Sequence, residues 1–599
     1  MATAMTQPES RMTSFDLNVR ARAWSLAIAL AGLVACSTTP PPASAPVVIA
    51  KPAAAPPVKA PERVAPTPSE APISTPTPTA TPAQPPYGPA VAARFPDPPV
   101  NYRTPAFEPG HRGFTSNAEL QSLLRNLVHD GRATPGGTTV MLLSLGSSQS
   151  GVPLEALLFT RNAEVDAASL VRAGRPTVLL IGQQHGDEPA GSEALMVIAQ
   201  ELARGALQPL LDRVNVLVLP RANPDGAQGN FRVTASGIDA NRDHLLLKTP
   251  EAQAQAQLIR DYRPVVVIDA HEYTVVGRYL EKFGTVQRFD AMVQYAMTAN
   301  LPEFITKASE EWFRQPMLAS LKREGLTAEW YYTTSTDIAD KKVSMGGTQP
   351  DTGRNVSGLT NAISFLIETR GVGIGRLHLK RRVHTHVTAM TSVLHSAADH
   401  ASDLMKLRQY VDNEVSAQAC QGEAVVEAGP TPSEYVLLML DATSGADKPI
   451  TVAWDSALAL RTLKSRTRPC GYWLAADQTD AVLRLRGLGV LVQQVADVGV
   501  MRGETYREVA REAGVRQDVR GTIADAGGVV LVQVETVPTL IDAAAGSYYV
   551  PLDQPLANLA IAALEPDTQN SYVSNRILSG VTSEARVMMR PEIKLVAVP

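Results

Sequence analysis

The chain has 599 residues and a formal net charge of −4, and 19% of its residues are charged. This length allows more than one domain, each with a sizeable core. Because nothing indicates a strongly basic surface, we expect no nucleic-acid partner.

The N-terminal residues 1–36 are predicted to be a secretory signal. Two arginines precede a short apolar run over residues 24–35, which is too short to span a bilayer as a stable helix. The run ends in Leu-Val-Ala-Cys, which resembles the lipobox of bacterial lipoproteins. This resemblance implies that Cys36 is lipidated and that the exported chain is anchored to a bacterial membrane in the cell envelope, facing the periplasm. An ordinary signal peptide that contains a cysteine is the alternative.

Residues 37–100 are predicted to be a disordered linker. They consist largely of Pro, Ala, Thr and Ser, and they hold 20 of the 45 prolines of the chain. Such a composition buries too little apolar surface to offset the entropy lost on ordering. We expect a semi-extended tether.

Residues 101–411 are predicted to form one α/β domain. Apolar strands are expected at residues 176–182, 214–220, 265–269 and 363–368, and helices at residues 189–204, 250–262 and 383–411. Continuous apolar strands that alternate with helices are typical of a mixed, mostly parallel sheet covered on both faces.

Residues 412–599 are predicted to form a smaller accessory domain that is α/β or β-rich. We expect strands at residues 435–440, 490–495 and 528–534, and helices at residues 478–488 and 505–512. Cys420 and Cys470 either form a disulfide or remain two unpaired buried cysteines, since the sequence does not fix their distance.

Polar residues follow the predicted strands, where ligand groups collect in open α/β sheets. His185 and Glu188 follow the first strand and His271 follows the third. Two imidazoles and one carboxylate can hold a zinc ion and leave its fourth position open. Asp269 is placed to orient a ligand as a neighbouring carboxylate.

Glu368 ends the fourth strand, where a carboxylate is costly without a task or a partner. Burial would raise its pKa towards the range of a general base. A buried pair with Arg370 is the alternative. Residues 223–226, Asn-Pro-Asp-Gly, are predicted to be a structural turn.

A loop over residues 237–243 carries Asn241 and Arg242, which are suited to grip a carboxylate. A polar, solvated loop is the alternative. Upstream, Arg232 either stabilises an oxyanion or is a surface residue.

Taken in order, these motifs resemble the zinc carboxypeptidases of the M14 metallopeptidase family, over about residues 110 to 400. The resemblance implies a carboxypeptidase-like α/β/α sandwich. It implies one zinc ion held by His185, Glu188 and His271.

The same resemblance implies roles in substrate binding and catalysis. Asn241 and Arg242 would bind the terminal carboxylate of a peptide, and Arg232 would polarise the scissile carbonyl. Glu368 would deprotonate the water molecule that the metal activates.

The sequence departs from the family at the mobile tyrosine that precedes a Gly-Gly loop. Here Gly346 and Gly347 follow lysine, valine and serine, and the nearest tyrosines are Tyr331 and Tyr332. The segment 353–355 either donates to the substrate or forms a simple turn with an exposed arginine, and Gln349 lies near the place expected to set side-chain preference.

The sequence therefore predicts a zinc metallocarboxypeptidase that removes C-terminal residues from peptides with a free carboxylate. A zinc-dependent deacylase or amidase acting on a non-peptide or cell-wall amide is the first alternative. A catalytically inert binding module is the second.

Overall fold

The computed structural model describes residues 86–132, 138–525 and 527–598. The predicted signal, Cys36 and the linker up to residue 85 lie outside the described residues. Among the described residues, every helix is too short or too polar to cross a bilayer.

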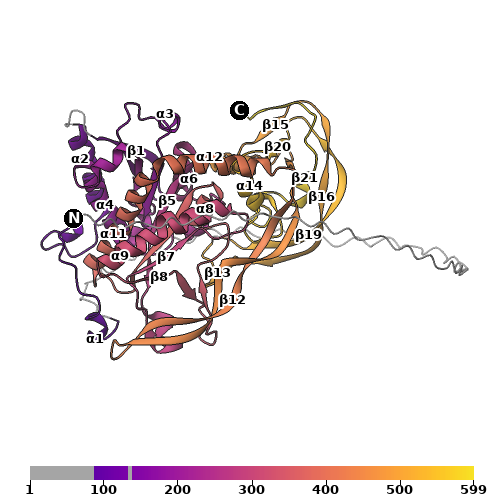
Figure 1. Ribbon diagram of the computed structural model, residues 1–599. Helices are drawn as coiled ribbons and strands as arrows, with labels where there is room; N and C mark the ends of the chain where they lie inside the picture. The colour runs from indigo at the N-terminus through magenta and orange to yellow at the C-terminus, as the bar shows by residue number, and fades with distance from the viewer. Residues whose placement is uncertain (1–85, 133–137, 526, 599) are drawn as a thin grey trace, which may run out of the picture. The chain divides into compact units, whose positions relative to one another are not determined.

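One sheet is mixed and has eight strands, in the order β1-β2-β4-β3-β5-β11-β7-β8. Its strands β1, β5, β7 and β8 are labelled in Figure 1. The four inner strands, β4, β3, β5 and β11, run parallel to one another, whereas β11 pairs antiparallel with β7. The strands are β1 (Thr139–Ser147), β2 (Pro153–Thr160), β3 (Thr177–Gly182), β4 (Asn215–Leu219), β5 (Val266–Thr274), β7 (Ala291–Tyr295), β8 (Ala328–Trp330) and β11 (Ile363–Val372).

Both faces of this sheet are buried under helices. Alternate residues of a strand point to opposite faces, and in β3 Leu180 and Leu179 belong to two different apolar clusters. The first cluster includes side chains of α4 (Pro189–Arg204) and α11 (Leu379–Asp399), and the second those of α3 (Ala167–Arg172) and α6 (Pro250–Tyr262). The predicted α/β/α sandwich with a mixed sheet is confirmed.

The predicted helix over residues 383–411 is two helices. The backbone of His400 leaves the helical region between α11 and α12 (Ala401–Ala417), and its ring stacks on Trp312 with centroids 4.7 Å apart. The other helices are α1 (Pro89–Ala92), α2 (Asn117–Arg132), α5 (Pro224–Gly229), α7 (Gly277–Phe283), α8 (Glu303–Ala308), α9 (Gln315–Arg323) and α10 (Gly353–Leu359).

The predicted linker ends too late, because residues just before position 100 are folded. Val91 in α1 is fully buried, and Tyr87 and Phe95 are nearly so. The guanidinium of Arg370 lies 3.4 Å from the ring centroid of Phe95. This arginine is therefore stacked on an aromatic ring rather than paired with Glu368.

The C-terminal part is β-rich, as predicted. A five-stranded sheet has the order β6-β12-β13-β10-β9, and a seven-stranded sheet has the order β19-β16-β21-β14-β20-β15-β22. Their strands are β6 (Thr285–Val286), β9 (Tyr332–Thr334), β10 (Val343–Met345), β12 (Glu423–Asp441), β13 (Asp447–Thr467), β14 (Gly471–Leu474), β15 (Gln493–Val495), β16 (Gly499–Gly514), β19 (Val529–Ala543), β20 (Tyr548–Pro551), β21 (Glu584–Val587) and β22 (Leu595–Ala597).

Two predictions about this part need correction. The helix expected at residues 505–512 lies inside β16, because pairing with β19 and β21 overrides the helix propensity of its Glu, Arg and Ala residues. The expected domain boundary between residues 411 and 412 falls inside α12. The expected helix at residues 478–488 is present as α13 (Thr479–Gly487), and α14 (Ala557–Leu564) follows later.

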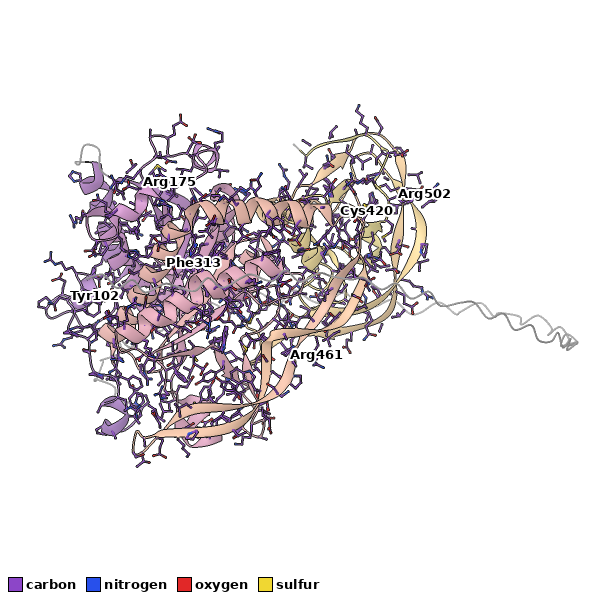
Figure 2. All side chains as sticks on the ribbon, viewed as in Figure 1. Tyr102, Arg175, Phe313, Cys420, Arg461 and Arg502 are labelled. Atoms are coloured by element: carbon purple, nitrogen blue, oxygen red, sulfur yellow. A yellow bond between two sulfur atoms is a disulfide. The ribbon has the colours of Figure 1, made fainter. Side chains whose placement is uncertain are left out.

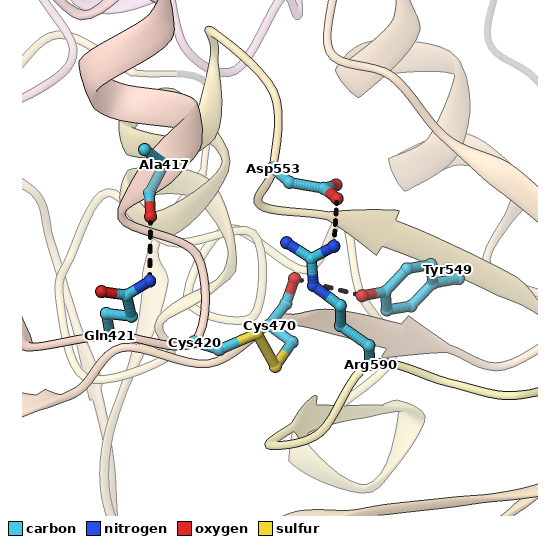
Figure 3. The surroundings of a disulfide bond; sticks show 7 residues. All are labelled: Ala417, Cys420, Gln421, Cys470, Tyr549, Asp553 and Arg590. Carbon is cyan, nitrogen blue, oxygen red and sulfur yellow. Dashed lines mark hydrogen bonds and ion pairs between the residues drawn. A yellow bond between two sulfur atoms is a disulfide. The ribbon is translucent and has the colours of Figure 1, made fainter.

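Cys420 and Cys470 form a disulfide, which settles the alternative left open by the sequence. The bond joins the segment after α12 to the residue before β14 (Figure 3). Beside it, the hydroxyl of Tyr549 donates to the carbonyl oxygen of Cys470 at 3.1 Å. The disulfide thus ties the helical end of the sandwich to the seven-stranded sheet.

Candidate active site

The register of the parallel strands brings the predicted ligands together. Gly182 at the end of β3 lies beside Ala270 of β5, and Glu368 of β11 lies beside His271. His185 lies in the loop that directly follows β3. Both β5 and β11 continue past these residues, so that His271 and Glu368 lie within strands rather than after them.

The three predicted metal ligands converge in a buried cluster. Nδ1 of His185 lies 2.8 Å from Oε1 of Glu188, and Nδ1 of His271 lies 2.8 Å from Oε2 of Glu188. The two Nδ1 atoms are 3.1 Å apart. One ligand atom from each residue lies within 4.8 Å of the others, which fits a single cation.

The other nitrogen of each imidazole faces a carboxylate. Nε2 of His185 lies 3.1 Å from Asp239, and Nε2 of His271 lies 2.8 Å from Asp269. A proton on each Nε2 leaves the Nδ1 lone pairs directed at the centre of the cluster, which is the arrangement that metal-binding histidines adopt. The donor set fits zinc, with an open fourth position.

Asp239 is a residue of the candidate site that the sequence analysis did not single out. Its carboxylate contacts His185 through one oxygen, while the other accepts from Nε and Nη2 of Arg232 at 3.0 and 2.9 Å. Burial opposes its charge, but Arg232 and His185 hold the pKa of Asp239 well below its usual range. The sequence feature that could have identified Asp239 is its position two residues before Asn241, in a loop already assigned to the site.

Arg232 lies at the metal ligands rather than on the outer surface. Its side chain is a quarter exposed, and Nη1 lies 3.1 Å from Nδ1 of His185 and 3.2 Å from Oε1 of Glu188. Burial opposes its charge, but Asp239 and Glu188 raise the pKa of Arg232. The guanidinium is therefore a permanent positive charge beside the cluster.

Glu368 is a buried carboxylate without a partner for one of its oxygens. Among the described residues, Oε2 finds no hydrogen-bond donor. Burial raises the pKa of Glu368 to about 7, and the charge of Glu188 adds to the rise. A poorly satisfied buried carboxylate beside a ligand set is typical of a group that handles protons.

The loop that carries the first ligands rests on the Asn-Pro-Asp-Gly segment. Asn223 caps α5 by accepting from the amide of Gly226 at 2.9 Å, so the predicted structural role is a helix cap. A Cβ on Gly186 would lie 1.8 Å from the backbone carbon of Gly226. Only glycine at position 186 therefore allows the two loops to touch.

Asn241 and Arg242 lie beside the centre, but both are already engaged. Nε and Nη2 of Arg242 donate to Oδ2 of Asp518 at 3.2 and 2.5 Å. The side-chain oxygen of Asn241 accepts from the amide of Gly353 at 2.8 Å, and its nitrogen lies 3.2 Å from Nε2 of His271. A carboxylate from the C-terminal part thus already occupies the guanidinium predicted to grip a substrate.

A cavity of about 170 Å³ opens on the ligand set. Its lining includes Glu188, Arg232, Glu368, Tyr331 and Tyr332, but not Asn241 or Arg242. The volume is below the roughly 300–1,000 Å³ of pockets for drug-sized ligands. A cavity of this size can accept the end of a peptide chain.

Of the two tyrosines, Tyr331 is the better placed to assist chemistry. The hydroxyl of Tyr332 is directed to the sulfur of Met439 at 3.4 Å. Burial, followed by the charge of Glu368, raises the pKa of Tyr331 to about 12, so its phenol stays protonated. It is a hydrogen-bond donor in the cavity.

Arg354 and Gln349 are held by the protein. Arg354 is 3% exposed and donates from Nη2 to the carbonyl of Gly347 at 2.6 Å, so the expectation of a simple turn with an exposed arginine is wrong. The side-chain oxygen of Gln349 accepts from Asn570 at 2.7 Å.

Comparisons with known proteins show which proteins this chain is similar to. Residues 132–381 match the family model described as zinc carboxypeptidase, peptidase M14. Carboxypeptidase 2 of Trichophyton rubrum is 30% identical over 423 residues, which cover 69% of this chain and 76% of that protein. Carboxypeptidase D of Mus musculus is 40% identical over 178 residues, which cover 23% of this chain and 13% of that protein.

Solved structures are more distant. A metallo-carboxypeptidase from Pseudomonas aeruginosa matches 47% of this chain and 68% of its own, with 20% identity and a TM-score of 0.33. Carboxypeptidase A from Helicoverpa armigera matches 48% of this chain and 75% of its own, with 15% identity and a TM-score of 0.35. At these scores the assignment rests on the sequence relatives.

The sandwich, the His₂Glu ligand set and the buried carboxylate beside it define a metal-dependent hydrolase. The relatives narrow this class, and the chain belongs to the M14 family of zinc carboxypeptidases. The predicted metallocarboxypeptidase function is confirmed, and the deacylase alternative is not favoured. Carboxypeptidases act on peptides, and the M14 family is zinc-dependent.

Proposed function

We propose that this enzyme binds one zinc ion through His185, Glu188 and His271 and removes C-terminal residues from peptides with a free carboxylate. The observation that carries the proposal is the convergence of both Nδ1 atoms on the Glu188 carboxylate. Zinc supplies a Lewis acid that polarises a carbonyl oxygen and lowers the pKa of a water molecule.

Glu368 is the general base in this proposal. It takes a proton from the attacking water, whose oxygen forms a bond to the scissile carbonyl carbon. It then returns that proton to the amine nitrogen as the C–N bond breaks. The support is its burial beside the ligands, with a pKa raised to about 7 by that burial.

Arg232 stabilises the carbonyl oxygen as negative charge develops on it. The support is the permanently charged guanidinium of Arg232, whose Nη1 atom lies beside Nδ1 of His185 and Oε1 of Glu188. Donors fixed before the reaction stabilise such charge most effectively. The phenol of Tyr331, in the same cavity, is a second donor to the reacting group.

Asn241 and Arg242 bind the terminal carboxylate of the substrate. The support is the carboxylate of Asp518, which Arg242 holds through two nitrogens, as it would hold a substrate. When the substrate enters, its terminal carboxylate replaces the carboxylate of Asp518 at Arg242.

The enzyme is exported and anchored to a bacterial membrane through lipid on Cys36, facing the periplasm. The supports are the basic and apolar segment that ends in Leu-Val-Ala-Cys and the disulfide between Cys420 and Cys470. Disulfides persist in oxidising compartments such as the periplasm.

A Glu368→Gln variant tests the mechanism. We expect it to keep a full complement of zinc, because Glu368 is not a ligand, and to lose hydrolysis by about 10²-fold or more. Elemental analysis gives the zinc content, and release of the C-terminal residue from a peptide gives the rate. Undiminished turnover by the Glu368→Gln variant would contradict the proposal.

Two controls make the test specific. Glu329→Gln changes a carboxylate on β8 outside the cavity and should leave the rate unchanged. Comparison of each peptide with its C-terminally amidated form separates the carboxypeptidase from an amidase, since equal cleavage of both forms would argue for the amidase.

A further inference from the structure

Two arginines in the catalytic cavity have no role in the mechanism above. Arg278, in α7, and Arg520 line the same cavity as Glu188, Arg232 and Glu368. Arg520 comes from the C-terminal part, in the turn between β17 (Gln517–Asp518) and β18 (Gly521–Thr522). The cavity is therefore built from both parts of the chain.

Neither guanidinium is paired with a carboxylate. In the part of the chain that the structure describes, the Arg520 guanidinium makes no hydrogen bond and no ion pair. Nη1 of Arg278 donates to the carbonyl oxygen of Thr334 at 3.3 Å, and this is its one such contact there. By contrast, Arg242 and Arg516 are both paired with aspartates.

The two positive charges act on each other. Burial lowers the pKa of Arg278, and the charge of Arg520 lowers it further. The carboxylates of Asp187, Glu188, Glu272 and Glu368 line the same cavity. Among the described residues none of them forms an ion pair with Arg278 or Arg520, so both guanidinium groups keep donors for an anion. A guanidinium fork matches a carboxylate in geometry as well as in charge.

The turn that carries Arg520 is held firmly in place. Gly521 has a φ of +122°, which favours glycine at the turn. On either side, Asp518 binds Arg242, Arg516 binds Asp351 at 2.6 Å, and Asp525 binds Lys248 at 2.9 Å. The backbone that carries Arg520 is therefore held in place, so that only the side chain itself is ordered when it binds a ligand.

We propose that Arg278 and Arg520 form an anion subsite in the catalytic cavity, which binds a carboxylate of the peptide substrate. The subsite rests on the proposed function, and it makes Arg520 a specificity-determining residue supplied by the C-terminal part. The carboxylate comes from an acidic side chain near the end of the peptide, since Asn241 and Arg242 hold the chain terminus in the proposed function.

Peptide binding to a hydrolytically inert background tests the subsite. The zinc-loaded Glu368→Gln protein is titrated by calorimetry with peptides carrying Glu or Gln at one of the last three positions, each as free acid and as amide. Adding Arg520→Gln should weaken binding of the recognised peptides about tenfold or more, as expected for a lost charge-assisted hydrogen bond. Arg278→Gln should act in the same direction.

The peptide set identifies the source of the carboxylate. Weakening confined to Glu peptides assigns the subsite to an acidic side chain. Weakening of all free acids, with no change for the amides, would place the chain terminus at these arginines and would overturn the assignment to a side chain. Unchanged binding of every peptide would overturn the subsite.

Three further measurements separate the subsite from other effects. Arg520→Lys keeps the charge and should restore part of the affinity, while equal melting temperatures show that the turn still folds. Arg502→Gln removes an exposed arginine of β16 and should change nothing (Figure 2). Failure of the unsubstituted enzyme to cleave any peptide would overturn the proposed function and leave this binding result standing.

Discussion

Beside the metal ligands, Glu272 connects three elements through a single carboxylate. It lies in β5, next to His271, and is fully buried. It accepts from Nε and Nη2 of Arg382 in α11 at 2.7 and 2.9 Å, and from the amide of Ala190 in α4 at 3.0 Å. Because Ala190 is the second residue of α4, whose N-cap is Glu188, this carboxylate also helps to fix the position of a proposed ligand.

An Arg382→Met substitution should destabilise the protein by about 3–5 kcal/mol, because it leaves the charge of Glu272 buried without its positively charged partner. The denaturation midpoint in urea measures the loss. Adding Glu272→Gln should recover part of it, since the uncompensated charge is then removed. Arg511→Met, in an exposed pair with Glu508, should cost less than about 1 kcal/mol. A loss no larger than that of the exposed pair would contradict this account.

At the scale of residues, local spacing in the sequence was enough to predict which residues the structure brings together at the candidate site. His185, Glu188, His271 and Glu368 follow apolar runs, and a strand pattern places such residues at one edge of a sheet. Asp518 was beyond prediction, because it lies 276 positions from Arg242 and no pattern marks it as a partner. Sequence spacing carries no information about such a contact.

At the scale of elements, the strands and helices of the sandwich follow closely from the sequence. The predicted helices over residues 189–204 and 250–262 have the bounds of α4 and α6. Continuous apolar strands buried on both faces leave little choice of structure. In β16, polar residues on a partly exposed strand gave a false helical signal, which only the partner strands correct.

A Gly186→Ala substitution should separate the ligand loop from α5, because the added Cβ would lie 1.8 Å from the backbone of Gly226. Backbone atoms cannot yield as a flexible side chain can. We expect reduced zinc content, measured by elemental analysis, together with loss of peptide hydrolysis. In Gly113→Ala the nearest atom to the new Cβ is 3.8 Å away, so that control should keep its zinc. Normal zinc content in Gly186→Ala would show that the loops adapt.

At the scale of the whole molecule, the predicted parts are less separate than their sequences indicate. The folded part begins before residue 100, and α12 crosses the expected boundary at residue 411. Contacts of Asp518 and Asp525 join the β-rich part to the loop that carries the site. Composition alone could not reveal this, because both parts have an ordinary globular composition.

Attachment to the membrane is a property of the whole molecule that one residue tests. With Cys36→Ser, the protein should move from the membrane fraction to the soluble fraction, because a lipid anchor can no longer form. Immunoblots of fractionated cells measure the distribution, and the activity per molecule should be unchanged. An unaltered membrane fraction would refute lipid anchoring through Cys36.

The pairing of Arg242 with Asp518 also has a consequence for biosynthesis. Since a ribosome makes the chain from its N-terminus, Arg242 emerges 276 residues before its partner. During that interval the nascent chain lacks the turn that faces the cavity and carries the partner of Arg242. The site therefore reaches its finished form only after Asp518 has been made and, for the exported protein proposed above, only after that residue too has crossed the membrane.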